Sequence, residues 1–342
     1  MNDPQLEGHM ASYIRRRKFL ATLLGGAAAW PLAAGAQQGG GMRRIGVLMG
    51  TAQNDPDQKT SLAALLEGLA ALDWRDGRNI HIEYRWAAGD PEQLRTYAAE
   101  LGALSLEVVL TQGTPATAAL RQAASTIPIV FVSVTDPVGS GLVVNLAHPG
   151  GNITGFSNYE TSMGGKWLAT LREIAPNVKR AAVLVNPENV GVARLVQEMS
   201  SAASRLRVEL NPAPVRDVAA IEHAIEAFAA REGGGLMVVA DFITLAHRDL
   251  IVSMATQHRL PSTFSERSFV AIGGLVSYGV DRAELFRRAA SYIDRILRGA
   301  YPAELPVQQP TKFELVVNLN TAKAIGLAIP ETFLLRADEV IE

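Results

Sequence analysis

The chain has 342 residues, of which 48% are hydrophobic, with 32 basic and 34 acidic side chains and no cysteine. This length exceeds what one hydrophobic core usually holds, so it predicts two lobes or domains. The near-neutral charge argues against a protein that binds nucleic acid by electrostatic attraction. Without cysteine, the chain has no disulfide, no thiolate nucleophile, no cysteine-ligated zinc and no iron–sulfur cluster.

The first 36 residues have the three parts of an export signal. A basic cluster at residues 15–18 precedes an apolar run that begins at Phe19, and Ala34-Gly35-Ala36 fits a small-residue cleavage site. We therefore expect cleavage near Ala36 and a periplasmic mature protein. Removing this segment, with its four basic and two acidic residues, changes the formal net charge from −2 to −4.

The basic cluster also resembles a twin-arginine signal, since residues 16–20 read R-R-K-F-L. General secretory export stays open as an alternative, and so does the choice between Met1 and Met10 as the start. A transmembrane anchor is a further alternative, because the apolar run just reaches spanning length. Gly25-Gly26 and Pro31 weaken that helix, and a lipid anchor is excluded because there is no cysteine to acylate.

Strands and helices alternate along the next part of the chain. Continuous apolar runs and period-two alternation predict strands at residues 44–50, 79–86, 106–110, 127–134 and 153–156. Helical spacing predicts helices at residues 61–72, 91–104 and 115–125. Asp90 is expected to cap the second helix, with Pro91 in its first turn.

The same alternation then restarts. Strands are predicted at residues 180–185, 208–212, 236–240, 261–264, 275–279 and 313–318, and helices at residues 163–174, 190–206, 218–231, 243–258, 282–297 and 321–325. Such alternation implies βαβ units and parallel sheets covered by helices. The predicted fold class is α/β, with two doubly wound parallel-sheet lobes joined by a hinge. Ligands prefer interfaces between domains, so we expect an interlobe cleft.

Candidate ligand-binding residues follow the carboxyl ends of the predicted strands, where open α/β sheets bind their ligands. Two more lie near the first crossover between the lobes. Together these candidates are Thr51, Gly113, Thr114, Pro115, Ala116, Thr135, Asp136, Asn158, Tyr159, Asn186, Asp241, Ser277 and Tyr278.

Residues 113–116 read Gly-Thr-Pro-Ala and are the most informative of these positions. Gly113 lets the backbone approach a ligand, Thr114 can cap the helix, and Pro115 fits its first turn. The exposed N–H groups and the helix dipole would favour an anion such as a carboxylate. The alternative is an ordinary capped helix without a ligand.

Asp136 and Asp241 are candidates to pair with a ligand ammonium, which together with a carboxylate site would suit a zwitterion. Asp136 could instead be a turn residue before Pro137, and Asp241 an N-cap for the helix predicted from residue 243. Tyr278 offers a ring for stacking and a hydroxyl for hydrogen bonding, or it packs in the core.

Catalytic and metal-binding patterns are missing from the sequence. There is no G-x-S-x-G elbow, no G-x-x-x-x-G-K-[ST] loop and no G-x-G-x-x-G after the first strand. The six histidines show no metal-ligand spacing. We therefore expect a protein that is not an enzyme and that has no cofactor and no metal.

Several segments resemble ABC-transporter substrate-binding proteins of the tryptophan/tyrosine-binding-like group, and the similarity spans nearly the whole mature chain. They are RRIGVL at 43–48, NIHIEYRWA at 79–87, IPIVF at 127–131, TDPV at 135–138, PGGNITG at 149–155 and PTKFELVVN at 310–318. The resemblance implies a type I periplasmic-binding fold, with two lobes, three crossover strands and closure on a ligand. Lobe 1 would comprise residues 43–156 plus about 280–299, and lobe 2 residues 157–279 plus about 305–342.

The resemblance also implies a function. It predicts a monomer that captures a small organic ligand, such as an amino acid or a carboxylate, and delivers it to an ABC permease with its ATPase. Among the candidates, those that match the family's cleft are the Thr114 loop, Thr135, Asp136, Asn186, Asp241, Ser277 and Tyr278, while Gln112 and Thr51 would retune the pocket. The competing hypotheses are an exported hydrolase-like α/β enzyme and a ligand-sensing domain for a partner receptor.

Overall fold

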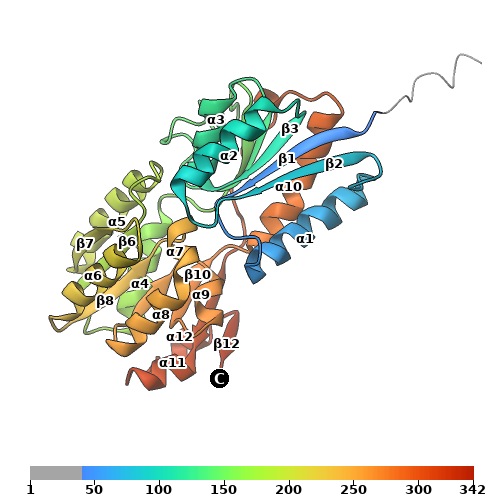
Figure 1. Ribbon diagram of the computed structural model, residues 1–342. Helices are drawn as coiled ribbons and strands as arrows, with labels where there is room; N and C mark the ends of the chain where they lie inside the picture. The colour runs from blue at the N-terminus through green and yellow to red at the C-terminus, as the bar shows by residue number, and fades with distance from the viewer. Residues whose placement is uncertain (1–40) are drawn as a thin grey trace, which may run out of the picture. The chain divides into compact units, whose positions relative to one another are not determined.

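The computed structural model describes residues 41–342 (Figure 1). The export signal predicted for residues 1–36 lies outside the described residues. Within residues 41–342, no helix is both long and apolar enough to cross a membrane.

The first sheet has five strands in the order β2-β1-β3-β4-β5, and every neighbouring pair is parallel. The strands are β1 (Arg43–Met49), β2 (Ile80–Trp86), β3 (Val108–Gln112), β4 (Ile129–Val134) and β5 (Ile153–Ser157). The central residues of β1, β3 and β4 are buried on both faces, which explains why these strands read as continuous apolar runs. The edge strand β2 instead alternates, with His81 exposed between the buried Ile80 and Ile82.

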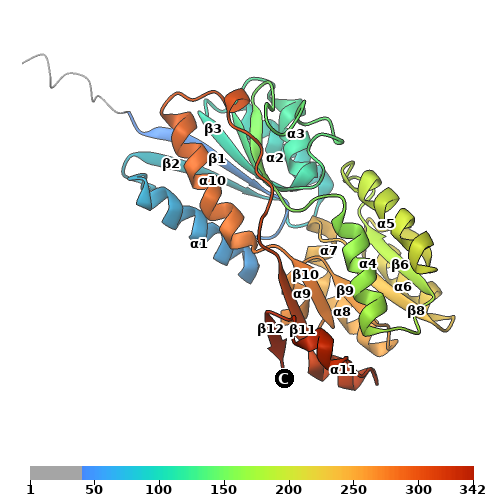
Figure 2. The same cartoon turned by 180° about the vertical axis from the view of Figure 1, so that it is seen from behind.

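Helices cover both faces of this sheet, so we call the sheet and these helices lobe 1. On one face pack α2 (Pro91–Ala103) and α3 (Gly113–Ala123), and on the other pack α1 (Pro56–Ala71) and α10 (Arg282–Leu297). Helix α10 follows the second sheet in sequence, yet it lies beside α1 (Figure 2). Gly68 permits this approach, because a Cβ there would lie 2.8 Å from the carbonyl oxygen of Arg287.

The second sheet has seven strands in the order β12-β11-β10-β9-β8-β6-β7, and only β10 and β11 pair antiparallel. The strands are β6 (Arg180–Val185), β7 (Glu209–Pro214), β8 (Gly234–Val238), β9 (Ser262–Phe264), β10 (Val276–Gly279), β11 (Glu314–Asn318) and β12 (Glu339–Ile341). We call this sheet and its helices lobe 2. The predicted α/β class with two parallel-sheet lobes is confirmed.

Lobe 2 includes eight helices of the described part. They are α4 (Met163–Ile174), α5 (Val192–Leu206), α6 (Val218–Ala229), α7 (Phe242–Ala246), α8 (Arg248–Gln257), α9 (Arg267–Ala271), α11 (Leu319–Ala324) and α12 (Glu331–Leu334). A short 3-10 helix, η1 (Pro302–Glu304), lies in the segment that connects α10 to β11, and it contacts β5. Core residues of α4 and α5 pack on one face, and those of α6, α8 and α9 pack on the other.

Three local predictions were wrong in detail. The helix predicted for residues 243–258 is two helices, because His247 leaves the helical conformation between α7 and α8. Helix α1 begins at Pro56 rather than at residue 61, with Asp55 as its N-cap. Thr114 does not cap α3, since the N-cap residue is Gln112. The Thr114 hydroxyl instead accepts the backbone N–H of Thr135 at 3.0 Å, a long-range contact between the ends of β3 and β4.

The predicted cap at Asp90 is confirmed, and it provides a test of local stability. Its carboxylate accepts the backbone N–H groups of Glu92 at 2.8 Å and Gln93 at 3.2 Å. Asp90→Ala is expected to lower the free energy of unfolding by about 1 kcal/mol, whereas Asp90→Asn should change it little because asparagine caps equally well. Denaturant titration would measure both variants. Equal stability of the alanine variant and the parent would contradict the assignment.

Candidate functional site

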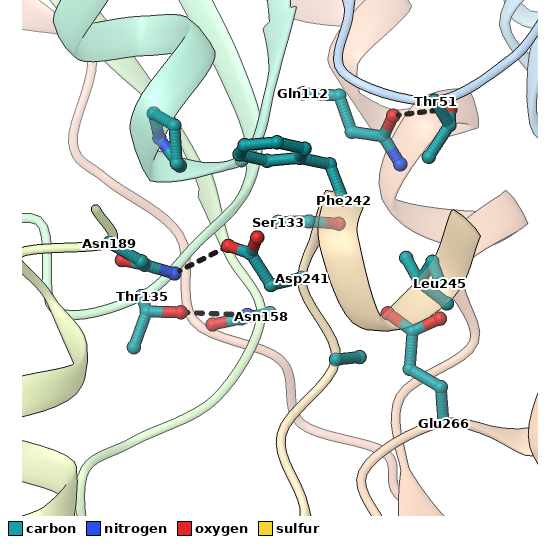
Figure 3. A pocket seen from close by; sticks show the side chains of 13 residues that line it. Thr51, Gln112, Ser133, Thr135, Asn158, Asn189, Asp241, Phe242, Leu245 and Glu266 are labelled. Atoms are coloured by element: carbon teal, nitrogen blue, oxygen red, sulfur yellow. Dashed lines mark hydrogen bonds between the residues drawn. The ribbon is translucent and has the colours of Figure 1, made fainter. Parts of the chain in front are cut away.

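A pocket lies between the two lobes at the carboxyl ends of their strands (Figure 3). Its empty space is about 410 Å³, a value that includes open solvent at its mouth. Lobe 1 and the crossover that follows β5 contribute Thr51, Gln112, Gly113, Pro115, Ser133, Thr135 and Asn158. Lobe 2 contributes Asn189, Ala240, Asp241, Phe242, Leu245 and Glu266.

Asp241 follows β8 and lies at the start of α7. Its carboxylate accepts the backbone N–H of Ile243 at 3.3 Å, and its own N–H donates to the hydroxyl of Thr244 at 2.9 Å. The N-cap interpretation of Asp241 is therefore confirmed, and the same side chain also lines the pocket. Two amides of the β6–α5 loop, from Asn186 and Asn189, donate to the carboxylate at 2.5 Å and 3.0 Å.

Asp241 is only 7% exposed, and no cationic side chain in the described part of the chain pairs with its carboxylate. Burial disfavours the charged form and raises the pKa of Asp241 to about 6, although the hydrogen bonds from Asn186, Ile243 and Asn189 act in the opposite direction. A buried carboxylate without a counter-ion is costly. A cationic group in the pocket would relieve that cost.

A second polar group points into the pocket from the crossover after β5. The amide nitrogen of Asn158 donates to the hydroxyl of Thr135 at 3.1 Å, which in turn lies 3.4 Å from the hydroxyl of Tyr159. Asn158 lines the pocket, and its side-chain oxygen is buried with no hydrogen-bond partner among residues 41–342. The hydroxyl of Ser133, at an irregularity of β4 with φ +57°, is likewise unpartnered within that range.

The remaining residues predicted from lobe 1 do not line the pocket. Thr114 is buried beneath it, and Ala116 is buried in the core of α3. The side chain of Asp136 accepts the backbone N–H of Gly139 at 2.9 Å, so the turn interpretation is confirmed. Tyr159 is buried, packs edge-on against Trp167 and reaches the pocket only through Thr135; burial raises its pKa.

Three residues predicted from lobe 2 also lie outside the lining. Asn186 acts on the pocket through its hydrogen bond to Asp241. Ser277 is buried in β10, and Tyr278 packs against Phe313 while its carbonyl accepts the indole N–H of Trp167. The six predicted residues that the structure brings together in the lining are Thr51, Gly113, Pro115, Thr135, Asn158 and Asp241.

Sequence reasoning missed several lining residues. They are Ser133, Asn189, Ala240, Phe242, Leu245 and Glu266. Asn189 could have been predicted from the sequence, since it lies in the same strand-end loop as Asn186. Ser133 could not, because it lies inside a predicted strand and reaches the pocket only through the local irregularity of β4. Within residues 41–342, no cluster of three or more His, Asp or Glu side chains is placed to hold a metal ion.

Comparisons with known proteins agree on one family. A family model described as ABC transporter substrate binding protein matches residues 53–341. A tyrosine-binding protein of Clostridioides difficile is 25% identical over 272 residues, covering 80% of this chain and 78% of that protein. Two solved structures cover 88% of this chain and 100% of their own. One is a conserved domain protein from Vibrio cholerae, with TM-score 0.82 and 30% identity. The other is an ABC domain in complex with L-Trp from Streptococcus pneumonia, with TM-score 0.81 and 26% identity.

Proposed function

Because this chain belongs to the family of ABC transporter substrate-binding proteins, we propose that it captures an amino acid in the interlobe pocket and delivers it to an ABC permease with its ATPase. We propose that it acts in the periplasm as a monomer, after cleavage near Ala36. The family is one of solute-binding proteins rather than enzymes, which favours transport over the hydrolase alternative.

The observation that carries the amino-acid assignment is the buried Asp241 carboxylate, against which residues 41–342 place no cation. An ammonium group has three N–H donors and no acceptor. The Asp241 carboxylate, the free oxygen of Asn158 and the hydroxyl of Ser133 all line the same pocket and can accept these donors. Asn186 and Asn189 would act as positioning residues, since they hold the carboxylate in place.

The start of α3 suits the carboxylate of the same ligand. Gly113 and Pro115 line the pocket, and the backbone N–H groups of a helix's first turn have no partner within the helix. The helix dipole adds to their attraction for an anion. The Asp241 carboxylate of lobe 2 and the start of α3 in lobe 1 would bind the two ends of a zwitterion, and this would draw the lobes together.

The rest of the pocket suits an apolar side chain. Phe242, Leu245 and Ala240 form its apolar wall on lobe 2. The relatives are a tyrosine-binding protein and a structure in complex with L-Trp. We therefore propose an aromatic amino acid as the ligand class.

A thermal-shift screen tests this proposal. The purified protein is unfolded, dialysed to remove bound ligand and refolded, and then mixed with L-Trp or L-Tyr. Tryptamine, which lacks the carboxylate, and indole-3-propionate, which lacks the amine, are the matched controls. The amino acid should stabilise the protein by about 2.7 kcal/mol at 100 times its Kd, and each control should act far more weakly. Equal stabilisation by indole-3-propionate would reject the ammonium site.

A further inference from the structure

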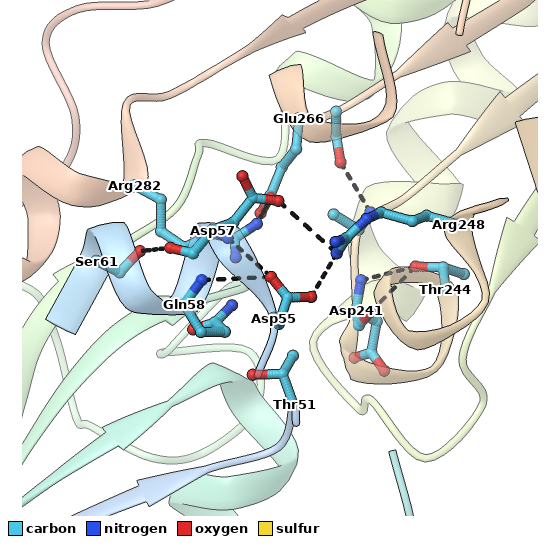
Figure 4. A network of polar contacts seen from close by, with 12 residues as sticks. Thr51, Asp55, Asp57, Gln58, Ser61, Asp241, Thr244, Arg248, Glu266 and Arg282 are labelled. Carbon is cyan, nitrogen blue, oxygen red and sulfur yellow. Dashed lines mark hydrogen bonds and ion pairs between the residues drawn. The ribbon is translucent and has the colours of Figure 1, made fainter. Parts of the chain in front are cut away.

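A buried ion pair joins the two lobes beside the ligand pocket (Figure 4). Arg248, the first residue of α8 in lobe 2, reaches Asp55, the N-cap of α1 in lobe 1, with an Nη1–Oδ2 distance of 2.5 Å. The same nitrogen lies 3.7 Å from Asp57. The side chains of Arg248 and Asp55 are only 12% and 11% exposed.

The surroundings of this pair set it apart from an ordinary surface salt bridge. Next to it, Glu266 at the N-cap of α9 pairs with Arg282, the first residue of α10, and their side chains are 14% and 9% exposed. Removing one partner of a pair shielded in this way leaves a charge poorly solvated, which costs far more than the loss of an exposed pair. Opening the lobes would separate Arg248 from Asp55 and return both groups to water.

The ion pair is also connected to the ligand site. Asp241 caps α7, this helix ends at Ala246, and Arg248 begins α8 two residues later. Glu266 lines the ligand pocket and pairs with Arg282. The lobe 2 residues that line the pocket and the lobe 2 members of the two ion pairs therefore lie on the same short segments.

We propose that Asp55 and Arg248 form a latch, an interlobe ion pair that stabilises the closed arrangement of the lobes in the absence of ligand. This inference goes beyond the proposed function, because it concerns the empty protein and does not depend on which ligand binds. The latch raises the fraction of empty protein already in the binding-competent arrangement, and the apparent affinity for any ligand rises with that fraction. Hinge closure of two domains is the motion on which the latch acts.

The chain contains a matched control for this latch. Asp55 and Asp90 occupy the same motif, Asp-Pro-acid-Gln, and each accepts the backbone N–H groups two and three residues further on. Asparagine retains such a cap while removing the charge. Asp55→Asn therefore removes the charge of the interlobe pair, and Asp90→Asn makes the same change at a cap with no ion pair in the described part of the chain.

The test is an interlobe distance measurement on the ligand-free full chain. Since the chain has no cysteine, Ala99→Cys on α2 and Glu198→Cys on α5 place one spin label on an exposed position of each lobe. Double electron–electron resonance then gives the populations of the closed and open arrangements. Asp55→Asn should raise the open-to-closed ratio about tenfold, and Asp90→Asn should leave it unchanged.

Arg248→Met is the second variant, and it should shift the ratio in the same direction. The double variant should open no further than the larger of the two single effects, because both substitutions remove one interaction. Three results would overturn the latch: an unchanged distance distribution in Asp55→Asn, an equal shift in Asp90→Asn, or a wild-type protein that is fully open without ligand. Circular dichroism confirms that each variant is folded. Failure of the amino-acid assignment would leave these distances unaffected.

Discussion

Replacing Asp241 by asparagine is expected to lower the affinity for an aromatic amino acid about 100-fold, since the loss of one member of a buried charge pair costs about 2–5 kcal/mol. The carboxylate is buried and accepts one amide N–H on each oxygen, so the variant removes the charge together with one of these two acceptors. Isothermal titration calorimetry with L-Trp at neutral pH measures the effect.

The control for this prediction is Asp136→Asn. Sequence reasoning proposed Asp136 and Asp241 equally as partners of a ligand ammonium, but the side chain of Asp136 accepts the N–H of Gly139 at 2.9 Å. Asp136 also has φ +43°, a backbone conformation that asparagine tolerates. The affinity of Asp136→Asn should match that of the parent. A loss of affinity in Asp136→Asn with none in Asp241→Asn would contradict this assignment and would place the ammonium site at Asp136 instead.

The same carboxylate should make binding pH-dependent. In the empty pocket the pKa of Asp241 is raised from 3.8 to about 6, so a ligand ammonium meets a neutral carboxyl group below that pH. The affinity should fall about tenfold between pH 7 and pH 5, and Asp241→Asn should remove this dependence. Since the folded protein holds this proton more tightly than the unfolded chain, the unfolding free energy of the empty protein should fall as the pH rises from about 4 to about 6.

Gly191→Ala is expected to weaken ligand binding at least about tenfold while leaving the lobes folded. Gly191 precedes α5 with φ −70°, so alanine can adopt the same backbone conformation without strain. A Cβ there would lie 2.1 Å from the carbonyl oxygen of Thr135, which belongs to the other lobe. Moving the lobes apart relieves this clash, and the variant should therefore favour the open arrangement. Calorimetric titration and denaturant unfolding give the affinity and the stability separately.

Gly165→Ala is the matched control, because its Cβ would meet Ala202 at 3.2 Å within lobe 2. This variant should alter stability slightly and affinity not at all. If Gly191→Ala bound the amino acid as tightly as the parent, close approach of Gly191 to Thr135 would not be needed for binding.

The residue pattern was sufficient for most of the elements and for one edge of each sheet, although it did not predict the short elements α9, α12 and β12. Strands such as β1 and β6 are buried on both faces, so their apolar runs are visible without a structure. The carboxyl ends of parallel strands lie on one edge, which is why Thr51, Thr135 and Asp241 could be chosen as candidates and why all three line the pocket. The cap at Asp90 was predictable because its partners are two and three residues away.

Only the tertiary structure decided how those polar groups are used. Asp136 and Asp241 occupy equivalent places after a strand, yet one bonds to its own turn while the other is buried against amides from a neighbouring loop. The Thr114 hydroxyl bonds to the adjacent strand end instead of its own helix. Asp55 and Arg248, which form the proposed latch, are separated by 193 residues. Periodicity and local spacing report on neighbours in sequence, so contacts between distant segments follow only from how the two lobes pack.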